Sequence, residues 1–133
     1  MALYAYNTAS QDVATGGTVA LSSSLRCGCG ASVADGGVRL NVGGGWYRVD
    51  VSVTGTLDAA GDVEVSAQVD GVDVPGATAS ETVAAAGDYA SLSMTFLVHA
   101  GGCCCNSRPL VTVVNAGAEA TFVNAMVTVT RVA

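Results

Sequence analysis

Strict alternation of apolar and polar residues makes positions 46–56 the clearest structural signal in the sequence. The apolar residues fall on one side of an extended segment: Tyr47, Val49, Val51 and Val53. The polar residues fall on the other side: Arg48, Asp50, Ser52 and Thr54. A period of two with aromatic and β-branched residues is typical of a half-buried strand. We therefore predict a central strand of a β-sandwich, which begins at Trp46 after the turn-forming glycines 43–45.

The same alternation predicts strands along the rest of the chain. They cover residues 2–6, 18–21, 38–42, 63–70, 72–74, 78–83, 90–98, 110–115 and 121–132. Segment 110–115 is apolar on both faces, so we expect it in the interior of a sheet. In the last strand we expect Val123, Ala125, Val127 and Val129 on the core face. Phe122 and Met126 would then lie on the opposite face.

Glycine, proline and small polar residues predict the connections between these strands. Asp70-Gly71 is typical of a two-residue hairpin turn, and Pro75-Gly76 is expected to break the strand pairing that follows. Residues 7–17, 22–37 and 99–108 are expected to be loops. No segment has helical spacing over a useful length. About nine or ten short strands within 133 residues predict a single domain over 1–133, an all-β two-sheet sandwich with jelly-roll topology.

Charge and composition exclude several partners. The net charge is −6, and the five basic residues are scattered arginines: Arg26, Arg39, Arg48, Arg108 and Arg131. Without a basic patch, binding to nucleic acid or to an anionic membrane is not expected. The first residues resemble no signal peptide, and no apolar run is long enough for a transmembrane helix. We expect synthesis in a host cytoplasm.

Large apolar side chains fall on strand positions where a monomeric sandwich should be polar. There are six of them: Tyr4, Tyr6, Trp46, Leu97, Phe122 and Met126. On neighbouring strands, such residues predict a buried subunit interface, and therefore a homo-oligomer. The alternative is irregular packing at strand ends.

Five cysteines form two groups in the predicted loops. Cys27 and Cys29 are in the first loop, and Cys103, Cys104 and Cys105 are in the second. A disulfide between the loops is the favoured interpretation, with free thiols in a reducing cytoplasm as an alternative. Zinc is disfavoured because structural sites generally use C-x-x-C spacing, whereas these are C-x-C and CCC. No metal and no cofactor is expected.

No residue pattern supports catalysis. His99 with Cys105 and Asp88 could be drawn as a nucleophilic set, but a glycine-rich loop is poor scaffolding for fixed geometry. A group of carboxylates is better explained as a solvated strand face than as a glycosidase or calcium site: Asp58, Asp62, Glu64, Asp70 and Asp73. Residues 43–45 lead into a strand and lack the lysine of a phosphate loop. We therefore expect no enzyme activity.

Several segments together resemble a known family. They are GGWYRVDVSVTGT, VEVSAQVDGVDVPGATAS, LSMTFLVHA and PLVTVVNAGAEATFVNAMVTVTRV. They are similar to the small jelly-roll domains of the tumour necrosis factor and complement globular-head type. In that family a glycine-aromatic step enters a long strand, as at Gly45-Trp46-Tyr47, a hairpin follows, and a hydrophobic strand closes the sandwich.

The resemblance implies a tight homotrimer that buries the outer face of one sheet. Stand-alone domains of this kind resemble virion proteins of tailed bacteriophages, such as head decoration and head-fibre proteins. Others are carried on collagen-like stalks at spore surfaces, and no Gly-X-Y stalk is present here. The expected function is therefore structural, at the virion surface, with the major capsid protein or another virion protein as partner. The alternative is an adhesive module that binds a glycan or receptor on a phage fibre or spore surface.

The polar face of the strand at 46–56 belongs to the predicted interface as well. If a trimer forms, Arg48 is expected to pair with Asp50 of its own or a neighbouring subunit. A charge pair buried in this way specifies register more than it stabilises.

Overall fold

The computed structural model describes residues 2–27, 31–40, 45–100 and 109–132, with only the backbone described at Arg26 and Cys27. These residues form eleven strands and no helix. The strands are β1 Ala2–Asn7, β2 Gln11–Val13, β3 Ser23–Cys27, β4 Ala31–Ala34, β5 Gly37–Leu40, β6 Gly45–Thr56, β7 Gly61–Val69, β8 Val72–Val83, β9 Tyr89–Ala100, β10 Leu110–Asn115 and β11 Ala120–Arg131. Among the described residues there is no helix that could cross a bilayer.

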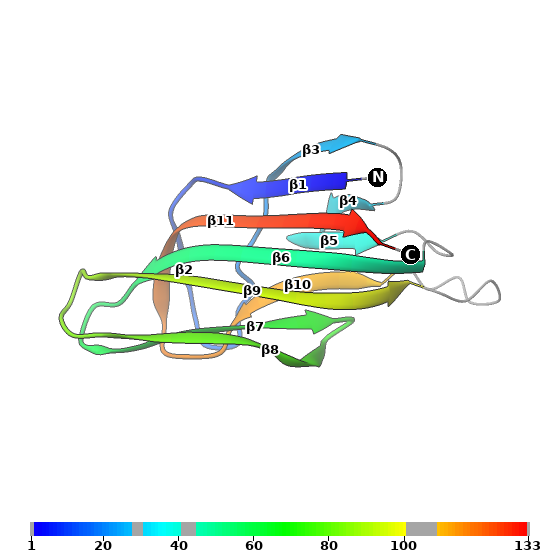
Figure 1. Ribbon diagram of the computed structural model, residues 1–133. Helices are drawn as coiled ribbons and strands as arrows, with labels where there is room; N and C mark the ends of the chain where they lie inside the picture. The colour runs from blue at the N-terminus through cyan, green and yellow to red at the C-terminus, as the bar shows by residue number, and fades with distance from the viewer. Residues whose placement is uncertain (1, 28–30, 41–44, 101–108, 133) are drawn as a thin grey trace.

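Two antiparallel sheets face each other (Figure 1). The six-stranded sheet has the order β3-β1-β11-β6-β9, and β2 pairs with the start of β11. The five-stranded sheet has the order β4-β5-β10-β7-β8. Neighbours in each sheet are mostly distant in sequence, because the chain crosses repeatedly between the layers. This arrangement confirms the predicted all-β sandwich with jelly-roll topology.

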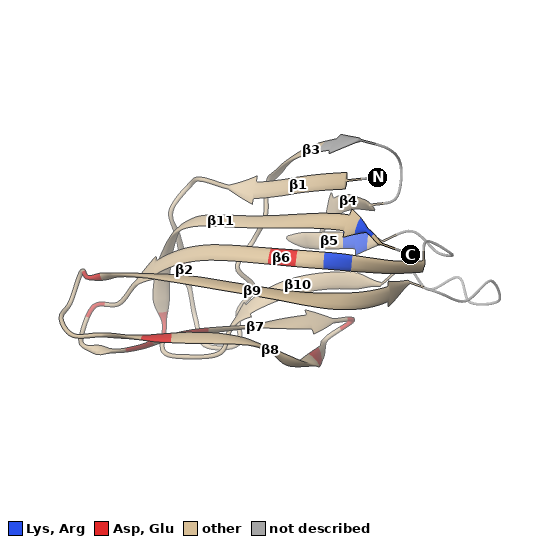
Figure 2. Ribbon diagram, viewed as in Figure 1, with Lys and Arg blue, Asp and Glu red and all other residues tan. Residues whose placement is uncertain are grey.

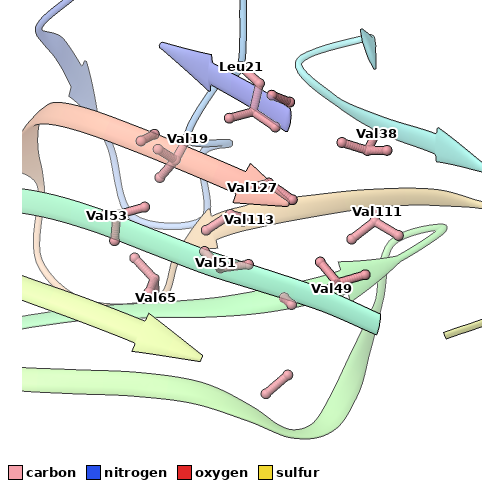
Figure 3. Close-up of a cluster of buried hydrophobic side chains, with 14 of the residues drawn as sticks. Val19, Leu21, Val38, Val49, Val51, Val53, Val65, Val111, Val113 and Val127 are labelled. Carbon is pink, nitrogen blue, oxygen red and sulfur yellow. The ribbon is translucent and has the colours of Figure 1, made fainter. Parts of the chain in front are cut away.

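Apolar side chains from both sheets fill the space between the layers (Figure 3). From the six-stranded sheet, Val49, Val51 and Val53 of β6 are each no more than 2% exposed. From the opposite sheet, Val65 of β7 and Val111 of β10 enter the same cluster. Most core side chains are valine or alanine. Because these side chains are small, the two sheets must approach closely to leave no empty space between them. The predicted core face of β6 is confirmed.

The hairpin between β7 and β8 follows the predicted turn chemistry. Asp70 and Gly71 both have positive φ, 53° and 83°, as the primed two-residue turn requires. The expected break of the pairing at Pro75-Gly76 is confirmed, because the residues between Asp73 and Thr78 have no partner on β7, although β8 itself continues to Val83. The chain accommodates these residues with a register shift, which lies opposite Ser66 and Gln68 of β7. A bulge of this kind keeps a proline in an edge strand without ending it.

Short strands occupy parts of the predicted loops. Segment 7–17 contains β2, and segment 22–37 contains β3 and β4. Residues 18–21, predicted as a strand, contribute only an isolated bridge from Thr18 to Val114. These elements are three to five residues long, and β3 and β4 are rich in serine and alanine. Their pairing comes from the sheets beside them rather than from their own hydrophobic pattern.

A bulge in β11 overturns the prediction for Phe122. Phe122 pairs with Gly55 and Asn124 pairs with Thr54, so Val123 is an extra residue on the β11 side. The extra residue shifts the alternation by one position. Phe122 therefore points into the core and is fully buried, whereas Val123, predicted on the core face, is half-buried. Beyond the bulge, Ala125, Val127 and Val129 are buried as predicted.

Candidate subunit interface

The outer face of the six-stranded sheet gathers most of the predicted interface residues. Antiparallel pairing places side chains of four strands in rows across it, because Cα partners share a face. One row runs from β1 to β9 in this order: Tyr4, Thr128, Asp50 and Thr95. A second row follows the same path: Tyr6, Met126, Ser52 and Ser93. A third row runs in this order: Ala2, Thr130, Arg48 and Leu97.

Seven of the eight predicted interface residues lie on this outer face. They are Tyr4, Tyr6, Trp46, Arg48, Asp50, Leu97 and Met126. Phe122 is the exception, because the bulge turns it into the core. We name the remaining seven, together with Leu25, the outer-face set. Leu25 pairs with Tyr4 from the edge strand β3 and is 67% exposed. Sequence reasoning missed it because its segment was interpreted as a loop.

Exposure of large apolar groups is concentrated on this face. Leu97 is 55% exposed, and Trp46 and Tyr4 are each 45% exposed. Tyr6 and Met126 are half-buried between their neighbours. Outward apolar groups on adjacent strands differ from single exposed residues, since they form a surface that water solvates poorly. This surface is the strongest candidate for a contact with another molecule.

A hollow of about 330 Å³ opens at the β3 side of the face. Residues of β1, β3 and β11 and of the following segments line it: Tyr4, Tyr6, Thr8, Leu25, Asn124 and Met126. The rings of Tyr4 and Tyr6 lie 5.7 Å apart at a tilt of 51°, which fixes one wall. The lining consists of aromatic and aliphatic side chains with a few hydroxyl and amide groups. Such a lining can accept an apolar side chain of a partner.

The centre of the face holds one charged pair. Arg48 and Asp50 follow each other on the outward side of β6, and Arg48 Nε lies 3.4 Å from Asp50 Oδ2. The hydroxyl of Thr95 on β9 donates to the other oxygen, Asp50 Oδ1, at 2.7 Å. The predicted pairing of these residues is thus present within one chain. Both side chains are partly exposed, 53% and 35%, so the pair alone contributes little to folding stability.

The end of the face beside β9 carries an aromatic pair. Trp46 on β6 and His99 on β9 are Cα partners, and their ring centroids lie 4.8 Å apart. His99, predicted in the loop 99–108, thus lies on β9, which pairs with β6 as far as Ala100. The structure places Asp88 at the opposite end of β9, just before Tyr89. Asp88 is therefore too far from His99 to orient it for catalysis.

Most acidic groups lie away from this face (Figure 2). Strands β1 and β9 contain no charged residue, and β11 contains only Arg131 at its end. Acidic side chains lie instead in turns, along β7 and β8, and at Asp12 of the short strand β2 beside the start of β11. There, neighbours on the adjacent strand hold them: Thr82 donates to Asp62 at 2.6 Å, and Gln68 donates to Asp73 at 3.0 Å. This agrees with a solvated strand face.

The cysteine predictions concern a region that the structure describes only in part. Cys29, Cys103, Cys104 and Cys105 lie outside the described residues, and only the backbone of Cys27 is described. Among the described side chains, no three histidine, cysteine or acidic groups gather closely enough to hold a metal ion. The disulfide between the two loops stays a prediction.

Comparison with solved structures agrees with the strand order. Eiger TNF from S. frugiperda superposes with a TM-score of 0.77 at 12% identity, over 100% of this chain and 92% of that one. Murine APRIL superposes at 0.70 with 13% identity, over 97% and 98% of the two chains. The PRD1 vertex protein P5 superposes at 0.53 with 15% identity, over 96% and 92%.

Sequence comparison adds nothing to these likenesses, since no family model and no curated protein matches the chain. Identities of 12–15% carry information about the fold alone. That information is nevertheless specific, because the alignments span almost the whole of each chain and include two TNF proteins of different animals. By its strand order, its two antiparallel sheets and these likenesses, the chain is a TNF-like jelly-roll domain.

Proposed function

We propose that the protein is a structural component of a virion that assembles as a homotrimer through the outer face of its six-stranded sheet. The observation that carries this proposal is the outer-face set: apolar side chains gathered on strands that are almost free of charge. An acidic chain with a net charge of −6 keeps this one surface nearly neutral. Copies can therefore approach there without strong repulsion.

The side chains of the face suit a stable contact. Tyrosine and tryptophan bury much area with few rotatable bonds, and they are the residues that most often dominate binding energy. Burial is worth about 25 cal/mol per Å² of apolar surface. The hollow beside Tyr4 offers a recess into which an apolar side chain of a second copy fits. At the other side of the face, Trp46 and Leu97 are large apolar side chains that are about half exposed.

The charged pair gives such a contact a defined register. When Arg48 and Asp50 are covered, each keeps its partner within its own chain, and Thr95 completes the hydrogen bonding of the carboxylate. A misaligned copy would place apolar groups over the pair and desolvate it without compensation. The pair therefore disfavours wrong alignments while adding little to affinity.

The virion assignment is supported by a structural neighbour and by the sequence resemblance to phage decoration and head-fibre proteins. The PRD1 vertex protein P5 has this fold across almost its whole chain. On this proposal the trimer decorates or stabilises a shell, with the major capsid protein as its partner. The five-stranded sheet and its acidic turns then face away from the trimer and remain solvated.

The trimer is tested by light scattering with matched variants. The wild type should have three times the 13.1-kDa mass of one chain. Trp46→Ala should lower that mass at micromolar concentration, because it removes a 45%-exposed anchor without touching the core. Val72→Ala is the control, since Val72 is 71% exposed on the other sheet. An unchanged trimer in Trp46→Ala and in Arg48→Ala would contradict the assignment of the face.

The role in the virion is tested by binding to empty capsids of the phage whose genome encodes the chain. Purified protein should cosediment with them at saturation, at sites that match a threefold assembly. Failure to bind, with the trimer intact, would remove the decoration role and leave the self-association standing. The two parts of the proposal are thus tested separately.

A further inference from the structure

The only histidine of the chain, His99, lies on the outer face of the six-stranded sheet. It follows Leu97 on the outward side of β9, and its side chain is exposed. Its ring centroid lies 4.8 Å from that of Trp46, at a tilt of 35°. Histidine is the side chain whose charge ordinarily changes between pH 5 and pH 8. A group that can gain a positive charge in this range therefore lies beside two apolar residues of the proposed contact.

The outer face offers no unoccupied carboxylate to a protonated imidazole in the part of the chain that the structure describes. Arg48 is the next outward residue of β6 after the Cα partner of His99, so it brings a positive charge to the same side. Asp50 follows it, but its oxygens already contact Arg48 at 3.4 Å and Thr95 at 2.7 Å. Strand β9 contains no aspartate, glutamate, lysine or arginine.

Charged residues of the other neighbouring strands are directed elsewhere. Arg131 of β11 has the buried Tyr47 as its Cα partner, so it belongs to the inward series of its strand. The turn between β7 and β8 lies at the same end of the molecule as His99, but in the other sheet (Figure 1). Its carboxylates have partners there, because Asp70 accepts from a backbone N–H of β10 and Asp73 accepts from Gln68.

We infer that protonation of His99 opens the proposed contact, so that the homotrimer is stable at neutral pH and dissociates in mild acid. This inference rests on the proposed function. In a separate chain, water solvates a protonated imidazole, and the nearby indole attracts it, because an aromatic face attracts a cation within about 6 Å. In the trimer a second copy would cover the same group. Covering a charge that has no partner is costly, so assembly favours the neutral imidazole.

A second copy supplies no compensating charge, because it contributes the same face to the contact. Asp50 is the only carboxylate of the outer-face set, and Arg48 neutralises it. While His99 is neutral, the face has no net charge. Once His99 is protonated, each copy brings one uncompensated positive charge into the contact, on the same side as Arg48. Like charges that lose water together oppose assembly more strongly than they would in solution.

The sign and size of the effect follow from the proton that each copy must lose on assembly. At pH 7.5 histidine is ordinarily neutral, so little is lost. At pH 5.5, one unit below the ordinary pKa of histidine, removing the proton costs about tenfold in equilibrium constant for each copy. Three copies should therefore raise the dissociation constant of the trimer about a thousandfold. Ordinary carboxyl groups titrate below this range and stay ionised.

Light scattering over a dilution series at pH 7.5 and pH 5.5 tests the inference. The concentration at which half of the wild-type trimer has dissociated should rise about thirtyfold at pH 5.5, the square root of the change in the constant. His99→Phe keeps a ring beside Trp46 without an ionisable nitrogen, and His99→Gln keeps a neutral polar group. Both variants should have the same midpoint at the two pH values. Circular dichroism at pH 5.5 verifies that each chain is folded.

The outcomes separate the inference from the proposed function. A wild-type trimer with equal midpoints at the two pH values would overturn the inference and leave the trimer standing. Equal loss of the trimer at pH 5.5 in the wild type and in His99→Phe would also overturn it, since another group would then be responsible. A single-chain mass at pH 7.5 and at every concentration would contradict the proposed trimer, and the inference with it.

A second measurement uses the unmodified chain, so it stands even if the variants fail to fold. The wild type is diluted in weakly buffered solution at pH 6, through the range in which its mass falls. Separated copies should take up protons, so the pH should rise as the trimer dissociates. Dissociation without proton uptake would show that His99 has the same charge in both states, and it would overturn the inference.

Discussion

The packing of Phe122 over Gly55 leads to a prediction with opposite signs in two backgrounds. A methyl group added at Gly55 would lie 3.0 Å from two ring carbons of Phe122 and 3.4 Å from a methyl of Val63. Phe122 is fully buried, so its ring has little room to move. Gly55→Ala should therefore destabilise the wild type by about 1–3 kcal/mol through overpacking.

Removing the ring should reverse this effect. Phe122→Ala alone should cost about 3–5 kcal/mol, as expected for a fully buried phenylalanine. In that background the methyl of Gly55→Ala enters the vacated space and also reduces the flexibility of the unfolded strand. It should then stabilise by about 1 kcal/mol. The two substitutions should thus be coupled by about 2 kcal/mol or more.

Chemical unfolding of the four proteins measures the cycle. Fluorescence of the single tryptophan and far-ultraviolet circular dichroism should be followed at one protein concentration, because the proposed assembly would stabilise the folded chain. If the free energy of unfolding falls with denaturant concentration at the same slope in all four proteins, the variants expose the same amount of surface on unfolding. If Gly55→Ala costs the same in both backgrounds, Phe122 does not lie on Gly55. The bulge in β11 would then be misplaced.

Two further predictions concern buried backbone contacts. Gly37→Ala should destabilise by about 3 kcal/mol, because the added carbon would overlap the carbonyl oxygen of Val111, and thermal unfolding would measure this. Asn115 is fully buried and donates to the carbonyls of Val13 and Ala118, each at 2.9 Å. Asn115→Ala should therefore cost about 1–3 kcal/mol in urea unfolding, whereas a change below 0.5 kcal/mol would show that water replaces the amide.

Much of the sandwich can be predicted from period-two alternation alone. Strands β6, β7 and β9 alternate strictly because one side faces the core and the other does not. Strand β10 is apolar on both sides, and it lies in the middle of its sheet as expected. The turn at Asp70-Gly71 could be predicted because few residues accept two positive φ angles in succession.

The remainder depends on contacts that a local pattern does not encode. Alternation cannot reveal the extra residue Val123, because Phe122 and Val123 are both apolar and either could be assigned to the core face. Phe122 faces the core because its ring fits over Gly55, which has no side chain and lies on another strand. Leu25 enters the outer-face set only because β3 pairs with β1. In each case the pairing of distant segments overrides the local signal.

Most charged groups lie away from the outer face, and this distribution would limit unordered association of the proposed assembly. In the proposed assembly, acidic groups along β7, β8 and the turns would remain in water, so each added copy would bring its negative charge to the surface of the particle. That charge opposes further, unordered association. Among the described side chains of the outer-face set, Arg48 and Asp50 are the charged ones, and they neutralise each other at 3.4 Å. The proposed assembly would therefore remove apolar groups from water while desolvating a single, internally compensated pair.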